Sequence, residues 1–205
     1  MCNHSKQASG FTLLELIVAI SIAGILMALA IPSFSDMMRN NRLTTYANEL
    51  VTSLNLARSE AIKRGVTVTV AKTSATTASY WSESGWNLFI DTDRDNNFDL
   101  PSSPPNPITD DILIRTYAAL PTNYILMANN FKNYITYKAD GTSNTNGSFA
   151  VCDNSDGSNI AKPYASRLII INKMGRIQMG KDTNNDGIPE QNDTAHTKLT
   201  DCTSP

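Results

Sequence analysis

The residues of this chain that could do chemistry are mostly carboxylates, and they gather in two loops. The stretch 182–193 carries oxygen-bearing side chains at loop positions 1, 3, 5, 9 and 12: Asp182, Asn184, Asp186, Glu190 and Asp193. With a glycine at position 6, this is the spacing of an EF-hand calcium loop, although an aspartate stands where a bidentate glutamate is usual. No flanking helices are expected, so the sequence predicts a free-standing calcium loop. A solvated turn is the alternative, because Asp, Asn and Gly also form turns.

The second acidic loop matches the calcium pattern less well. Asp91, Asp93, Asp95 and Asp99 alternate with other residues, but the loop lacks the glycine and has Ser102 at position 12. A β-hairpin turn explains this composition as well as calcium does. Calcium is the only cofactor that the sequence suggests, and the chain is expected to require none.

Catalysis is not expected from the other residues. Only two histidines are present, His4 near the start and His196 in a polar tail, and there is no Gly-x-Ser-x-Gly elbow for a nucleophile. The net charge of −2 gives no general basic character that would indicate a nucleic-acid-binding protein. The sequence therefore predicts a protein that is not an enzyme.

Three cysteines are present, at positions 2, 152 and 202. Cys152 and Cys202 have no Cys or His at metal-ligand spacing, and they form an even pair once Cys2, near the start, is set aside. Disulfides persist where a chain lies outside the cytoplasm. We expect them to form a disulfide that ties down the polar C-terminal tail. On the chain-entropy model such a bridge would stabilise the fold by roughly 4 kcal/mol.

The chain is organised around an apolar run at residues 11–31, which contains a single charge, Glu15. A helix of about 20 apolar residues is long enough to span a bilayer core of roughly 30 Å. A charge within such a segment is costly, so Glu15 is expected to have a partner other than lipid.

The helical pattern continues beyond this run. Pro32 is expected to kink the helix, after which apolar residues recur at offsets of three and four up to Ile62. Gly65 is a suitable C-cap. The sequence thus predicts one helix from Phe11 to about Arg64, apolar all round in its first half and amphipathic in its second.

The remainder of the chain is predicted to be β-structure. Alternating or β-branched runs occur at 66–70, 85–91, 112–120, 124–127, 134–138, 148–152, 168–172 and 176–179. A hairpin is expected around Pro121, and a turn at Asp140–Gly141. With about seven or eight short strands and no second helix, we predict an α+β fold in which the long kinked helix packs on an antiparallel sheet.

The start of the chain resembles a known processing site. Gly10, Phe11, Thr12 and Glu15, followed by the apolar run, stand at the offsets found in type IV prepilins and pseudopilins. The resemblance implies that a prepilin peptidase cuts after Gly10 and N-methylates Phe11. It also implies that Glu15 pairs with the N-terminal amine of a neighbouring subunit. The expected organisation is then a leader at 1–10, a transmembrane and assembly helix at 11–31, an amphipathic helix at 32–65 and a β-rich domain at 66–205.

Later motifs narrow the resemblance. The order of 58–65 (RSEAIKRG), 85–93, 138–141 (KADG), 149–152 and 167–176 is similar to that of the GspH/FimT class of minor pilins and pseudopilins. The resemblance covers residues 10 to about 176. It implies a minor type IV pilin that helps to initiate pilus assembly and sits near the filament tip. The implied partners are other minor and major pilins, the prepilin peptidase and the inner membrane, with the domain in the periplasm before assembly and on the pilus surface afterwards.

Two other functions remain open at this point. Some members of the class bind DNA during natural transformation through basic residues near the C-terminus, which here would be Lys173, Arg176 and Lys181. Gln178 stands where a further arginine would help, and the acidic tail would repel phosphate. The third interpretation, a type II secretion pseudopilin, shares the same leader and helix.

Overall fold

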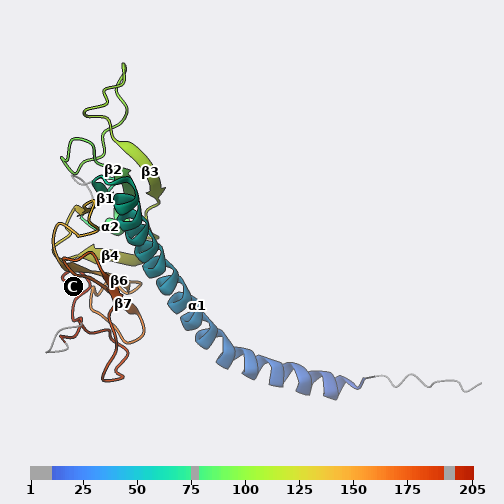
Figure 1. Ribbon diagram of the computed structural model, residues 1–205. Coiled ribbons are helices and arrows are strands. Elements are labelled where there is room, and N and C mark those ends of the chain that lie inside the picture. The colour runs from blue at the N-terminus through green and yellow to red at the C-terminus, as the bar shows by residue number, and fades with distance from the viewer. Residues whose placement is uncertain (1–10, 75–78, 192–196) are drawn as a thin grey trace, which may run out of the picture. The chain divides into compact units, whose positions relative to one another are not determined.

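The computed structural model describes residues 11–74, 79–191 and 197–205 (Figure 1). The chain divides into two compact units, Met1–Arg39 and Asn40–Pro205. Helix α1 (Leu13–Arg64) contributes its first half to the first unit and its second half to the second. All the described strands belong to the second unit, which is called the domain from here on.

Both ends of α1 follow from local sequence. Thr12 is the N-cap, because its Oγ1 accepts a hydrogen bond from the backbone N–H of Glu15 at 3.2 Å. At the other end the N–H groups of Gly65 and Val66 both donate to the carbonyl of Ala61, at 2.9 and 3.3 Å. Gly65 has a φ of 67°, so the predicted glycine C-cap is confirmed. The helix is unbroken across position 32, and the kink predicted there stays a prediction.

Within the part of the chain that the structure describes, eight strands form two antiparallel sheets of four, which confirms the predicted α+β class. The first sheet has the order β3-β2-β1-β5, with β3 (Ile112–Tyr117), β2 (Trp86–Ile90), β1 (Val68–Lys72) and β5 (Tyr134–Tyr137). The second has the order β4-β6-β7-β8, with β4 (Tyr124–Ala128), β6 (Gly147–Asp153), β7 (Ser166–Ile171) and β8 (Ile177–Met179).

Two details of the sequence prediction were wrong. A short helix, α2 (Trp81–Ser84), lies between β1 and β2, where none was expected. The hairpin predicted around Pro121 does not form, because β3 pairs with β2 and β4 pairs with β6 in the other sheet. The segment at Pro121 is a turn that carries the chain between sheets, with the N–H of Tyr124 donating to the Pro121 carbonyl at 2.9 Å. Strand β3 is mostly exposed whereas β4 is mostly buried, so the two strands fit different environments.

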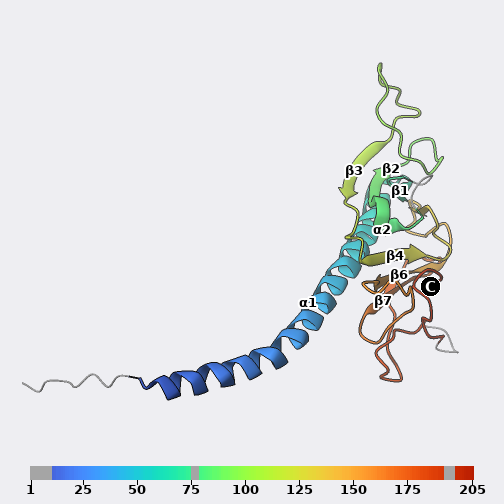
Figure 2. The same cartoon turned by 180° about the vertical axis from the view of Figure 1, so that it is seen from behind.

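The second half of α1 supplies one side of the domain core (Figure 2). Its buried stripe consists of Leu43, Ala47, Leu50, Leu54, Ala57 and Ala61, all fully buried. This stripe packs with apolar residues of both sheets, including Trp86, Phe149 and Ile169. The offsets of three and four therefore place one face of the helix against the sheets, as the sequence predicts, as far as Ala61; Ile62, which was counted in the pattern, is exposed.

The C-terminal tail has a small core of its own. Cys152 and Cys202, the pair predicted to be bonded, are joined by a disulfide. Around them Leu168, Ile188 and Leu199 form a second apolar cluster. This cluster was not predicted, because the sequence of the tail is mostly polar.

Candidate functional site

The first half of α1 carries apolar side chains that nothing in its own unit covers. Among the described side chains of residues 11–39, none is buried; Phe11 is 81% exposed and Leu26 is 61% exposed. Exposed apolar side chains occur on every side of this segment: Leu13, Leu14, Leu16, Ile17, Val18, Ile20, Ile22, Ile25, Leu26, Met27, Ile31, Phe34, Met37 and Met38. A continuous apolar surface of this kind marks an interaction site.

Over the described residues, none of the helices combines the length and the hydropathy that a membrane crossing requires.

Glu15 is the only carboxylate in this apolar surface up to residue 31. Thr12 and Glu15 have the Thr-x-x-Glu spacing of a capping box, and the N–H of Glu15 is held by Thr12. Its side chain is exposed, and none of the hydrogen bonds or ion pairs found within the described residues uses its carboxylate. The carboxylate is thus available to a partner outside the chain. The pairing of Glu15 with a neighbour's amine stays a prediction, and Gly10 lies outside the described residues.

Three of the motifs that were separate in the sequence meet in the domain. Arg58, on α1, donates from Nε to the carbonyl of Gly141 at 2.9 Å and from Nη2 to the carbonyl of Met174 at 3.2 Å. Gly175 packs so closely that an added Cβ would lie 2.1 Å from the carbonyl oxygen of Gly141. Arg58 and these glycines therefore fix the turns after β5 and β7 to the helix, and the motifs are structural.

The three residues considered for DNA binding are exposed but not clustered. Lys173 and Arg176 lie in the turn between β7 and β8, where Asn172 Oδ1 accepts the N–H of Arg176 at 3.0 Å. Lys181 lies beyond the other end of β8, and its carbonyl accepts the N–H of Glu190 at 2.8 Å. The structure thus brings two of the three cations to one turn and places the third beside the acidic tail. DNA binding stays a prediction.

The carboxylates of the tail loop are already engaged within the chain. The two oxygens of Asp182 accept the N–H groups of Asp186 and Gly187, at 3.1 and 2.7 Å. Asp186 pairs with Lys198 at 2.7 Å, and hydrogen bonding from Lys198 lowers the pKa of Asp186. Glu190 Oε2 accepts the hydroxyl and N–H of Thr183. Calcium binding by Asp182, Asn184, Asp186, Glu190 and Asp193 stays a prediction, and Asp193 lies outside the described residues.

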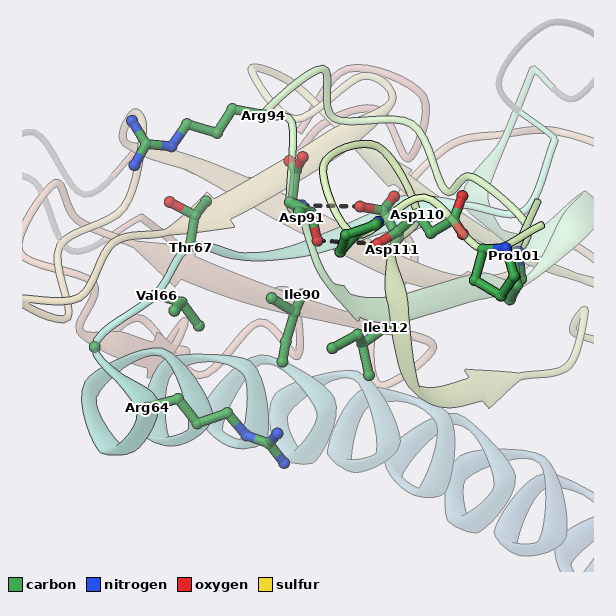
Figure 3. A pocket seen from close by; sticks show the side chains of 14 residues that line it. Arg64, Val66, Thr67, Ile90, Asp91, Arg94, Pro101, Asp110, Asp111 and Ile112 are labelled. Atoms are coloured by element: carbon green, nitrogen blue, oxygen red, sulfur yellow. Dashed lines mark hydrogen bonds between the residues drawn. The ribbon is translucent and has the colours of Figure 1, made fainter. Parts of the chain in front are cut away.

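The other acidic loop gathers its carboxylates into two groups of three. Figure 3 shows two of these residues, Asp91 and Asp111. Ligand oxygens of Asp91, Asp93 and Asp111 all lie within 4.8 Å of one another, and so do those of Asp93, Asp95 and Asp99. Asp111 was missed because it lies far along the chain from the motif. The pairing of β2 with β3 brings Asp111 to this cluster. Ile90 faces Ile112 in that pair, so Asp91, directly after Ile90, lies opposite Asp111, directly before Ile112.

Burial shapes the electrostatics of this cluster. Asp91 is 3% exposed and Asp111 is 4% exposed, and burial raises the pKa of both carboxyls. Thr69 donates its hydroxyl to Asp91 Oδ2 at 2.8 Å, whereas the buried Oδ1 has no hydrogen-bond partner. Asp111 accepts the N–H groups of Thr92 and Asp99, at 2.9 and 3.0 Å.

A hollow of about 650 Å³ adjoins the cluster. Its wall includes the apolar side chains of Val66, Ile90 and Ile112 as well as Asp91 and Asp111 (Figure 3). In Figure 3 the nearby Arg94 side chain extends away from the carboxylates. Within the described residues, no lysine or arginine forms an ion pair with this cluster.

Comparison with known protein families agrees with the fold and with the N-terminal segment. Residues 5–31 match the prokaryotic N-terminal methylation motif. Residues 46–175, more than half of the chain, match the family described as type II transport protein GspH. The chain therefore belongs to the GspH family, a class of minor type IV pilins and pseudopilins whose members are structural proteins.

Individual relatives are more distant. Two proteins called "Fimbrial protein" from Pseudomonas aeruginosa are each 40% identical over 60 residues, which is 29% of this chain and 38% of theirs. The chain thus covers well under half of these curated relatives. The crystal structure of the type IV minor pilin FimU from Pseudomonas aeruginosa PAO1 is similar with a TM-score of 0.50 and 22% identity. The match covers 69% of this chain and 90% of that one, and it supports the fold.

Proposed function

We propose that this protein is a minor type IV pilin, a non-catalytic subunit that helps to initiate pilus assembly and sits at or near the filament tip. The observation that carries the proposal is the first half of α1, an apolar surface exposed on every side. A chain that leaves so much apolar area uncovered gains free energy when lipid or other apolar helices cover it. The N-terminal methylation motif on the same segment supports a membrane-anchored protein that moves to the pilus surface.

The partners follow from this segment. Before assembly the inner membrane covers residues 11–31, with the domain in the periplasm and a prepilin peptidase removing residues 1–10. After assembly the helices of other minor and major pilins take the place of lipid. Glu15 then pairs with the terminal amine of a neighbouring Phe11, an interaction that strengthens in surroundings of low dielectric constant.

The assembly role is tested with two carboxylates of the same helix. In cells whose chromosomal copy is deleted, Glu15→Ala should reach the membrane at wild-type levels and yet fail to restore surface pili. Glu60→Ala, at the domain end of α1, should restore them, because Glu60 pairs with Arg64 and Lys63 of its own helix. Pilus counts by electron microscopy and membrane-fraction immunoblots are the measurements. Normal piliation by Glu15→Ala, together with a clear deletion defect, would refute the pairing.

Processing gives a separate test. Gly10→Ala should block or slow leader removal, because the peptidase must accommodate a minimal residue at the cut. Intact-mass analysis of the membrane fraction should find the full chain in the variant and a chain beginning at methylated Phe11 in the wild type. Complete processing of Gly10→Ala would contradict the prepilin assignment.

The second candidate function is a minor pseudopilin of type II secretion. The description of the matching family favours it, and the same helix would serve a pseudopilus. The deletion strain separates the two: loss of pili and twitching supports the first, and loss of protein secretion supports the second. Loss of DNA uptake alone, with normal pili and secretion, would favour a DNA-binding minor pilin.

A further inference from the structure

We propose that Asp91, Asp93 and Asp111 form a calcium site that closes the base of the loop joining β2 to β3. The three carboxylates come from the end of β2, from the loop itself and from the residue before β3. Their ligand oxygens lie within 4.8 Å of one another. Oxygens on opposite sides of a calcium ion are about 4.6–5.2 Å apart, because Ca–O distances are about 2.3–2.6 Å.

The independent observation that points to a ligand is the buried oxygen of Asp91. Asp91 is 3% exposed, and its Oδ1 has no hydrogen-bond partner while Oδ2 accepts from Thr69. Buried polar atoms are nearly always paired, and leaving a buried carboxylate oxygen unpaired is costly. A cation bound between Asp91, Asp93 and Asp111 would satisfy this oxygen and offset the repulsion among the three carboxylates.

The ligand chemistry favours calcium. Only carboxylates take part, and hard oxygen ligands suit Ca²⁺ and Mg²⁺ rather than metals that prefer sulfur or imidazole. Calcium requires six to eight oxygens, and Asp95 and Asp99, which lie near Asp93, extend the available set. Magnesium needs a near-ideal octahedron of shorter bonds, which a site assembled from a surface loop does not readily supply.

The tail loop, which has the better sequence motif, lacks these features in its described part. Its Asp182 is used by two backbone N–H groups and its Asp186 by Lys198. Within the described residues no lysine or arginine pairs with the Asp91 cluster, and Asp91 Oδ1 has no hydrogen-bond partner. The structure thus shifts the stronger case for calcium from residues 182–193 to the β2–β3 loop.

The cluster also lies where an ion would act on the sheet. The hydroxyl of Thr69, on β1, donates to Asp91, and its oxygen lies 3.0 Å from the hydroxyl oxygen of Thr136 on β5. The Thr136 hydroxyl in turn donates to Oδ1 of Asn96, in the loop, at 3.0 Å. Asp111 in turn holds the N–H groups of Thr92 and Asp99. Calcium would therefore fix the base of the loop to β1, β2 and β5 together.

The test uses the full chain in a non-ionic detergent, with calcium chloride as the probe. The melting temperature, followed by near-ultraviolet circular dichroism, should rise by about 3–6 °C at a calcium concentration ten times Kd. Titration calorimetry should give a Kd on the order of 10⁻⁴ to 10⁻³ M, as in extracellular calcium modules. Asp91→Asn should weaken binding at least tenfold and yet melt, in chelator, at or above the wild-type temperature, since the buried charge is gone.

Two controls locate the site. Asp110→Asn makes the same charge change one residue from Asp111, outside both carboxylate groups, and should bind calcium as the wild type does. A variant carrying Asp182→Asn with Asp186→Asn should do so too. Equal melting temperatures in calcium and chelator, wild-type affinity in Asp91→Asn, or loss of binding in the tail variant alone would each overturn the proposal. An equal response to magnesium would overturn the choice of metal.

Discussion

The two halves of α1 belong to one helix, yet they differ in what covers their apolar side chains. From residue 13 to 38 apolar side chains point in every direction and stay exposed. From residue 43 to 61 most of them lie on one stripe that is buried against the two sheets of the same domain, with Tyr46, Val51 and Leu56 half-buried beside it. A single stripe can be covered by the chain's own sheets, whereas a helix that is apolar all round needs other molecules to cover it.

The largest expected effect comes from a pair of matched leucines. Leu50→Ala should lower the free energy of unfolding of the domain by about 2–5 kcal/mol, because it opens a cavity in the core. Leu26→Ala should leave that value unchanged, since Leu26 is 61% exposed and lies outside the core of the domain. Denaturant unfolding of the full chain in detergent, followed by the fluorescence of the buried Trp81 and Trp86, measures both. Equal losses of unfolding free energy in the two variants would contradict the difference between the two halves of α1.

Glycine substitutions test the same contrast between packed and uncovered positions, with smaller expected effects. Gly175 and Gly157 both have positive φ, 72° and 70°, but only Gly175 has a close neighbour. We expect Gly175→Ala to cost about 1–3 kcal/mol more than Gly157→Ala in the same unfolding assay, because its Cβ would collide with the Gly141 carbonyl. Gly24, in the first half of α1, has nothing within 4 Å of an added Cβ, so Gly24→Ala should not change the unfolding of the domain. Equal costs at positions 175 and 157 would contradict the close packing.

The smallest effect concerns the domain end of α1. Hydrogen bonding from Arg64 lowers the pKa of Glu60 below 4.5, its ordinary value. A lowered pKa means that the contribution to stability is present above pH 4.5 and is lost as the pH falls through the value in the folded state. Glu60→Gln should therefore lower the melting temperature slightly at pH 7, and the difference from wild type should fade below pH 4.5. A difference that persists unchanged in acid would exclude the ion pair as its cause.

The features that could be predicted from the sequence are those determined by neighbouring residues. The stripe on α1, the cap at Gly65 and the turn at Asp140–Gly141 each depend on a few adjacent positions, and the structure has them. The turn, for example, has the N–H of Gly141 donating to the carbonyl of Lys138 at 2.8 Å.

What could not be predicted depends on strand pairing across the chain. The segments around Pro121 satisfy the local rules for a hairpin, yet their partners lie in different sheets. Asp111 joins Asp91 only because β2 and β3 pair across a long loop, and the burial of Asp91 depends on β1. From the sequence, the two acidic loops could be compared only by the spacing of their motifs. The pairing of Lys198 with Asp186 depends on the fold and could not be predicted.

The disulfide between Cys152 and Cys202 limits how far the domain can be extended by a pulling force. It joins β6, an inner strand of its sheet, to a residue 50 positions further along the chain. If the domain were pulled open, the residues between the two cysteines could not extend, which removes about 170 Å of contour length at about 3.4 Å per residue. The pulled chain would therefore be shorter than it would be without the disulfide. Strands β7 and β8, which lie between the two cysteines, would stay close to β6.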